Sequence, residues 1–275
     1  MRKIPIDLVV GESATAKQTL LHYWQQAQFT PQSISLNITH ASSISLQSAC
    51  LCCRMHNETS EKLRAAFMQA LQKQIPVFSS VLLNCDKQVQ SRQIIYTLGQ
   101  DFFLKERFFY EASILVLDRQ DIAVLAHYTE SKQDSKTKTK TKTIAQEDKA
   151  TFAQLYPQLS EASEVSEASA LSPYLHYLSA TDLIVLVDEA ESMSSILELK
   201  QTQANFLSHA QEVLFSLYAQ LSFFNTAQHE LDKADIPDIL LITELSAEKI
   251  AEYKQNWQQR HKRAPVLKKH SLFFY

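Results

Sequence analysis

The sequence predicts an α/β protein in which a mainly parallel sheet is flanked by helices. Short apolar runs typical of buried strands alternate with longer segments whose apolar residues recur at helical spacing. Hydrophobic residues make up 45% of the chain, which is sufficient for a sizeable core. There are two glycines in 275 residues, where about 7% is ordinary. Few turns can therefore depend on glycine.

Apolar or alternating runs indicate the strands. A run that ends at Gly11 predicts a buried first strand, and the next run alternates as a half-buried strand does. The third lies directly before a group of cysteines. In chain order, the expected strands cover residues 4–10, 33–38, 44–46, 77–83, 112–117, 183–187 and 239–243.

Helices are expected between these strands. The first covers about residues 17–28, with Leu20, Leu21 and Trp24 on one face. The second covers 57–73, where apolar residues follow the i, i+3, i+4, i+7 spacing of an amphipathic helix. A long helix that contains Phe206, Ala210, Val213, Leu214, Leu217 and Leu221 precedes the last strand, and a final helix is expected from about Ser246.

The chain is expected to form a single domain, 1–275, with a flexible low-complexity insertion at about 129–172. Lysine and threonine alternate within residues 135–143, and residues 160–172 are rich in Ser, Glu and Ala. Neither stretch has an apolar face that could pack on a core.

Composition excludes several classes of function. A net charge of −3 gives no basis for nucleic-acid binding. No apolar run reaches the length of a membrane span, and the N-terminus has no signal-peptide pattern. We therefore expect a cytoplasmic protein without membrane or nucleic-acid partners. In a reducing cytoplasm its cysteines would be free thiols or metal ligands.

The cysteines point to a metal site. Three of the four, Cys50, Cys52 and Cys53, lie within four positions. Neighbouring thiols suit the geometry of a disulfide poorly, but thiolates are good ligands for zinc. A fourth ligand could be Cys85, His56, a water molecule or a side chain from a partner. The alternative is that these cysteines are small buried hydrophobic residues without a metal.

The turn after the first strand has part of a phosphate-binding pattern. Gly11 and Lys17 stand at the separation found in GxxxxGK[ST], between an expected strand and an expected helix. Ala16 replaces the second glycine, and Gln18 replaces the hydroxyl residue that binds magnesium. Thr19 points about 100° further round the helix and cannot substitute for it. A structural strand-to-helix turn is the alternative interpretation.

Together these features resemble the CobW-type P-loop GTPases, a family of metallochaperones with a GCxCC motif. Ala49-Cys50-Leu51-Cys52-Cys53 is similar to that motif, with alanine in place of glycine, and Gly11 to Lys17 is similar to the phosphate loop. Arg263-Ala264-Pro265-Val266-Leu267 is similar to the last strands of the family's G domain. The resemblance implies a P-loop NTPase-like fold, zinc bound by the cysteines, and a client metalloprotein as partner.

Departures from the family argue against GTP and Mg²⁺ as cofactors. Where the family has NKxD, which reads the base, the chain has Ile242-Thr243-Glu244-Leu245. Asp118 and Asp188 each end an expected strand, and either could match the family's Val-Asp-Ala strand. The chain also ends where the family's C-terminal domain would begin.

These observations favour a zinc-binding metal-homeostasis protein whose nucleotide hydrolysis is lost or weak. Two alternatives are compatible with the same residues. One is an active GTPase that uses Gly11, Lys17, Gln18 and Thr19. The other is a non-catalytic scaffold for protein interaction.

Overall fold

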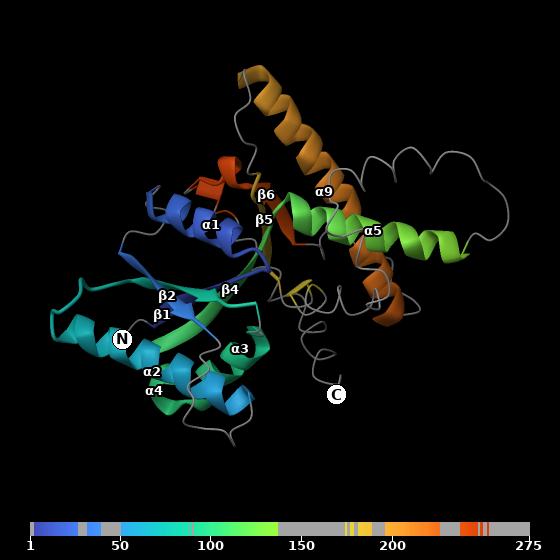
Figure 1. Ribbon diagram of the computed structural model, residues 1–275. Coiled ribbons are helices and arrows are strands. Elements are labelled where there is room, and N and C mark those ends of the chain that lie inside the picture. The colour runs from blue at the N-terminus through green and yellow to red at the C-terminus, as the bar shows by residue number, and fades with distance from the viewer. Residues whose placement is uncertain are drawn as a thin grey trace.

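The computed structural model contains a six-stranded, wholly parallel sheet in the order β2-β3-β1-β4-β5-β6 (Figure 1). The structure describes residues 3–26, 32–39, 51–87, 89, 91–136, 174, 177–178, 181–188, 196–225, 237–246, 248–249 and 252. All the strands end at one edge, which we call the carboxyl edge. In open sheets of this kind, ligands bind outside that edge.

The strands and helices alternate along the chain, as the sequence predicted. In chain order they are β1 (Ile4–Val10), α1 (Ala14–Gln26), β2 (Ser33–Ile38), α2 (Leu51–Leu71), β3 (Ser80–Cys85), α3 (Ser91–Gln100), α4 (Phe102–Arg107), β4 (Phe108–Leu117), α5 (Arg119–Lys136), β5 (Leu183–Leu186), α9 (Ile196–Asn225), β6 (Asp238–Leu241) and the 3-10 turn η2 (Ile242–Glu244).

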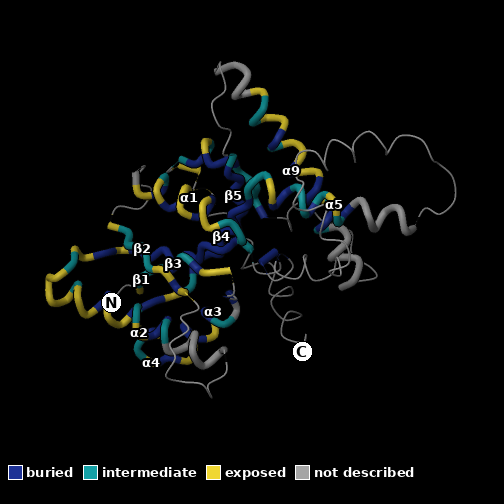
Figure 2. Tube along the Cα trace, viewed as in Figure 1, coloured by how far each residue is buried: buried dark blue, intermediate teal, exposed yellow. Residues whose placement is uncertain are grey.

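Helices pack on both faces of the sheet. On one face, α1 contributes Leu20 and Trp24 to a core that includes Val9, Leu82 and Val116. On the other face, α2, α3, α5 and α9 cover the second core (Figure 1). The central strands are buried along most of their length (Figure 2). Because both faces are covered, these strands consist of nearly continuous apolar residues.

The predicted fold class is confirmed, but several boundaries differ. The strand expected at 77–83 is β3 and begins later, at Ser80. The helix expected at 57–73 is α2 and begins earlier, at Leu51, so that Cys52 and Cys53 lie in its first turn. The strand expected at 44–46 lies outside the described residues, as does most of the final helix expected from Ser246.

Three helices were not predicted: α3, α4 and α5. Helix α5 continues to Lys136 and therefore includes residues 129–136, where the flexible insertion was expected to begin. The prediction of a loop was wrong for these residues. The rest of that insertion, to residue 172, lies outside the part of the chain that is described. Among the helices of the described residues, none combines the length and apolar character that a membrane crossing requires.

Candidate functional site

The turn after β1 lies at the carboxyl edge, because it follows the last residue of that strand. Strands β3 and β4 flank β1 there. Gly11 has φ +147°, and a Cβ atom built on it would lie 2.4 Å from the carbonyl oxygen of Val116. Glycine is therefore required at this position, both for the backbone conformation and for the close approach to β4. The sequence retains one of its two glycines here, so the turn is constrained even though Ala16 occupies the second glycine position.

The amine of Lys17 is bound within the protein. Lys17 is 4% exposed, and its Nζ donates a hydrogen bond of 2.6 Å to the backbone carbonyl oxygen of Cys85 at the end of β3. Burial lowers the pKa of Lys17, while the nearby Cys85, Asp86 and Glu12 act in the opposite direction. The residue predicted to bind phosphate thus contacts the adjacent strand.

The two residues after Lys17 face solvent, away from the contact between Lys17 and Cys85. Gln18 and Thr19 are both exposed, and the hydroxyl of Thr19 donates to the Thr15 carbonyl oxygen at 3.0 Å. The start of α1 is capped by Ser13, whose Oγ accepts from the Ala16 amide at 3.2 Å. Of the predicted loop residues, the structure brings Gly11 and Lys17 to the carboxyl edge, but it does not bring Gln18 or Thr19 into contact with them.

Carboxylates dominate the surroundings of Lys17. Asp118 follows β4 and exchanges backbone-to-side-chain hydrogen bonds with Asp121, each of 2.9 Å, so that the pair caps the start of α5. Burial and the neighbouring Asp118 raise the pKa of Asp121 to about 6. Glu12 and Asp86 add further negative charge near Lys17. An incoming phosphate would therefore meet repulsion from several groups.

The second aspartate that ends a strand has a structural partner. Asp188 follows β5, and both its oxygens accept hydrogen bonds from Arg119, at 2.6 and 2.9 Å. The same guanidinium lies 4.7 Å from the ring centroid of Phe206 on α9. This contact joins α5, β5 and α9.

The predicted zinc ligands lie at the boundary of the described chain. Cys50 lies outside the described residues, and the backbones of Cys52 and Cys53 form the first turn of α2, although their side chains are not described. Two turns further along, Glu58 accepts from the amide of Thr39, which follows β2, at 3.1 Å. The first turn of α2 is therefore near the carboxyl edge, like the Gly11–Lys17 turn.

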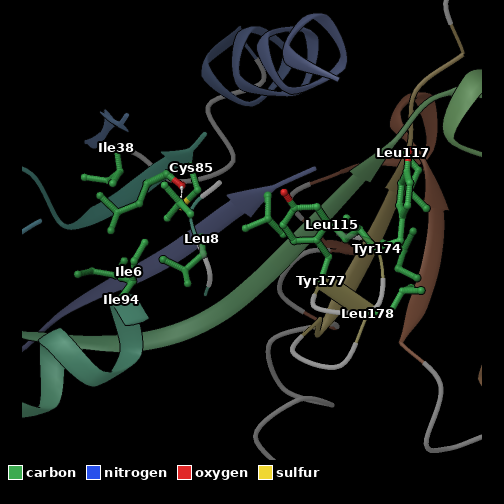
Figure 3. Packing of buried hydrophobic residues seen from close by; sticks show 14 of the residues in the cluster. Ile6, Leu8, Ile38, Cys85, Ile94, Leu115, Leu117, Tyr174, Tyr177 and Leu178 are labelled. Atoms are coloured by element: carbon green, nitrogen blue, oxygen red, sulfur yellow. Dashed lines mark hydrogen bonds between the residues drawn. The ribbon is translucent and has the colours of Figure 1, made fainter. Parts of the chain in front are cut away.

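Cys85 is unsuited to be the fourth ligand. Its side chain is 1% exposed and lies among Leu8, Ile38 and Ile94 in the apolar core, and its Sγ donates to the Leu83 carbonyl oxygen at 3.4 Å (Figure 3). Burial raises the pKa of this thiol to about 12, so it stays protonated at neutral pH. Metals bind the thiolate. Among the described side chains, no group of three or more His, Cys, Asp or Glu residues is arranged to hold a metal ion.

Two tyrosines at this edge were not predicted. Tyr174 donates to Asp121 Oδ1 at 2.6 Å, and Tyr177 donates to Glu12 Oε1 at 3.1 Å and to the Lys87 carbonyl oxygen at 2.5 Å. Their three-residue spacing is that of one helix face, which is the only signal the sequence offers. That signal gives no indication of contacts with residues 53 and 165 positions away.

Comparison with known proteins yields a distant similarity of structure. No family model matches the chain, and no curated protein sequence matches it. Among solved structures, the Zn(II)-bound YjiA GTPase from E. coli overlaps with it at a TM-score of 0.35 and 15% identity. The overlap covers 74% of this chain and 55% of that one, so the chain spans about half the length of that protein. The fold of this chain is defined by its own parallel sheet and by the turn at Gly11. The chain has an α/β fold in which a six-stranded parallel sheet is flanked by helices.

Proposed function

We propose that this protein is a metal-homeostasis protein that binds zinc through Cys50, Cys52 and Cys53, and that it no longer turns over nucleotide. The observation that carries the zinc proposal is the position of Cys52 and Cys53 in the first turn of α2, near the carboxyl edge. Amides of a first helical turn have no partners within the helix, and such a position favours the thiolate form of cysteine.

Three thiolates from one short segment would leave one place in a tetrahedral zinc site for another ligand. Burial of Cys85 argues against this thiol as the fourth ligand. The remaining candidates are His56, a water molecule and a side chain of a client metalloprotein. A site with one exchangeable ligand would suit transfer of the metal to a client.

Loss of nucleotide turnover is supported by the hydrogen bond that Lys17 makes within the protein. Phosphoryl transfer needs a lysine on the phosphates and a hydroxyl on the magnesium ion. Here Lys17 donates to the Cys85 carbonyl, Gln18 is exposed, and the hydroxyl of Thr19 donates to Thr15. Removing Lys17 from its carbonyl would leave a buried acceptor unpaired.

The test of the zinc site is a competition titration against a chromophoric chelator, using the full chain purified under reducing conditions. We expect the wild type to bind zinc at micromolar concentration or tighter, and Cys52→Ser to lose most of this affinity. Cys85→Ser is the matched control and should bind as the wild type does, because that thiol lies in the core. Failure of the wild type to bind zinc would refute the proposal.

An active GTPase makes a different prediction. It requires magnesium-dependent binding of a fluorescent guanine nucleotide that is lost in Lys17→Ala. Our proposal expects no such binding by either protein.

A non-catalytic scaffold is the second candidate, because Lys17 donates to the Cys85 carbonyl oxygen and Glu12 accepts from Tyr177, so both side chains of the turn have structural partners. Under this alternative, the cysteines of the native protein would react slowly with a thiol reagent, and a chelator would not accelerate the reaction. A zinc site predicts that the chelator accelerates labelling of Cys50, Cys52 and Cys53.

A further inference from the structure

Tyr174 and Tyr177 extend to the carboxyl edge from the chain that precedes β5. Tyr174 is 6% exposed and Tyr177 is 3% exposed, and both belong to the core cluster that includes Leu115 and Leu117 (Figure 3). The Tyr174 hydroxyl contacts Asp121 of α5, and the Tyr177 hydroxyl contacts Glu12 in the turn after β1. The two tyrosine side chains thus contact groups at the place where β1, β3 and β4 end.

Both tyrosine hydroxyls donate hydrogen bonds to carboxylate or carbonyl oxygens. Burial raises the pKa of Tyr174 and of Tyr177, and the adjacent carboxylates act in the same direction, so both stay protonated. Tyr174 donates to Asp121, and the single proton of the Tyr177 hydroxyl is shared between two acceptors, the Lys87 carbonyl oxygen and the Glu12 carboxylate. Hydrogen bonds to ionised acceptors are stronger than those between neutral groups.

Tyr177 and Lys17 lie close to the same groups. Glu12, Asp86 and Cys85 all act electrostatically on the Lys17 amine, and the same three act on the Tyr177 hydroxyl. Tyr177 also bonds the chain directly after Asp86, through the Lys87 carbonyl. The Tyr177 hydroxyl and the Lys17 amine therefore lie beside the same residues, Glu12, Cys85 and Asp86, where β1 and β3 end.

Helix α9 contacts the chain at Leu178, directly after Tyr177. Tyr218 of α9 donates to the Leu178 carbonyl oxygen at 3.1 Å, and Leu178 itself is 2% exposed. The Thr181 hydroxyl donates to the Tyr177 carbonyl oxygen at 2.6 Å. Movement of the backbone at Tyr177 and Leu178 would therefore break the hydrogen bonds from Thr181 and Tyr218.

We propose that Tyr174 and Tyr177 form a latch that closes the Gly11–Lys17 turn and shields the Lys17 amine from anionic ligands such as inorganic phosphate. The latch is bonded to α5 through Asp121 and to the turn through Glu12, and it is backed by α9. It is independent of the zinc proposal, because no cysteine of the predicted metal site takes part in it. Release of the tyrosines would expose Lys17.

Lysine footprinting tests the latch directly. Full-length protein is methylated with formaldehyde and a borohydride reagent, and the rate at each lysine is followed by mass spectrometry. We expect Lys17 to react roughly tenfold faster in Tyr177→Phe than in the wild type, since a lost buried hydrogen bond changes an opening equilibrium by about that factor. Tyr174→Phe should accelerate it as well, and it replaces the first variant if that one does not fold.

Tyr110→Phe is the matched control. It removes a tyrosine hydroxyl that donates to the Asp182 carboxylate at 2.5 Å, away from the Gly11–Lys17 turn. Lys17 should react in this variant as in the wild type, and the half-exposed Lys62 should react alike in all the proteins. Equal Lys17 rates in wild type and both latch variants would overturn the proposal. The proposal would also be overturned if Tyr110→Phe accelerated methylation of Lys17 as much as the latch variants do. The same holds if amide exchange in β1 and β4 became faster by the same factor, since that would indicate general destabilisation.

Discussion

The pKa values of two aspartates at helix starts, Asp121 and Asp101, are shifted in opposite directions. The two residues lie in different regions of the molecule. Asp121, at the start of α5 by the carboxyl edge, lies beside Asp118, and its pKa is raised to about 6. Asp101 caps α4 in the corner where α2, α3 and α4 meet. Burial acts to raise its pKa, but hydrogen bonds from Arg64 and the Leu104 amide outweigh burial and lower it.

The difference lies in where the cations are. In the α2–α4 corner, Arg64 places one nitrogen 2.8 Å from each Asp101 oxygen and stacks over Phe103, with its centre 5.2 Å from the ring. At the carboxyl edge, the amine of Lys17 donates instead to a neutral carbonyl oxygen. The corner therefore pairs its buried carboxylate with a cation, whereas Asp121 at the edge is stabilised by a tyrosine hydroxyl and a backbone amide.

The largest expected effect is at Gly11. Gly11→Ala would place a Cβ atom 2.4 Å from the Val116 carbonyl at a φ of +147°, so backbone must move at the carboxyl edge. We expect a loss of about 3 kcal/mol or more in the free energy of unfolding, measured by denaturant titration. Gly99→Ala in α3 is the control, because nothing lies within 4 Å of its added Cβ. It should change stability by less than about 1 kcal/mol. Equal effects would remove the contrast between the regions.

A second prediction concerns the pH dependence caused by Asp121. Its folded-state pKa of about 6 exceeds the ordinary 3.8, so the folded state holds the proton more tightly. The contribution of this group to stability is therefore present at low pH and is lost as pH rises from about 4 to 6. Asp121→Asn cannot titrate. The stability of the wild type minus that of Asp121→Asn should fall by roughly 2–3 kcal/mol between pH 4 and pH 7. A difference that rises with pH would contradict this.

The smallest expected effect is in the corner. Asp101→Ala removes the cap of α4, whose carboxylate accepts from the Phe103 and Leu104 amides at 2.9 and 3.1 Å. We expect a loss of about 1–2 kcal/mol at neutral pH. Because the pKa of Asp101 is lowered, this contribution is present above the ordinary pKa and is lost as pH falls through the folded-state value. Arg64→Ala, at a half-exposed position, should cost about 1 kcal/mol or less. Greater loss in Arg64→Ala than in Asp101→Ala would be inconsistent with this ranking.

The fold could be predicted largely from apolar runs. The strand Ser33–Ile38 was predicted with the bounds observed, because its alternation is regular. Helix α4 could not be predicted, because six residues owe their helical form to the Asp101 cap and to Arg64 on another helix. The start of α5 carried a usable signal in Asp118 and Asp121, whose spacing is that of a reciprocal cap.

The candidate site could be predicted less completely. Gly11 and Lys17 were recognised from their spacing, but the partner of Lys17 is a carbonyl group 68 residues away. That contact exists because β3 pairs with β1, which the sequence alone does not specify. The link from Tyr177 to Glu12 spans 165 residues and depends equally on topology. Conversely, the thiol cluster is evident in the sequence, and its geometry stays a prediction.

A single titration tests the central claim that the thiols, rather than the Gly11–Lys17 turn, are the working site. Zinc affinity of the full chain is measured by chelator competition with and without GTP and Mg²⁺, for the wild type, Cys52→Ser and Lys17→Ala. The account predicts one zinc ion per chain in the wild type and in Lys17→Ala, with affinity unchanged by nucleotide and greatly reduced in Cys52→Ser. Zinc binding that requires GTP and Lys17, or no zinc binding by the wild type, would contradict it.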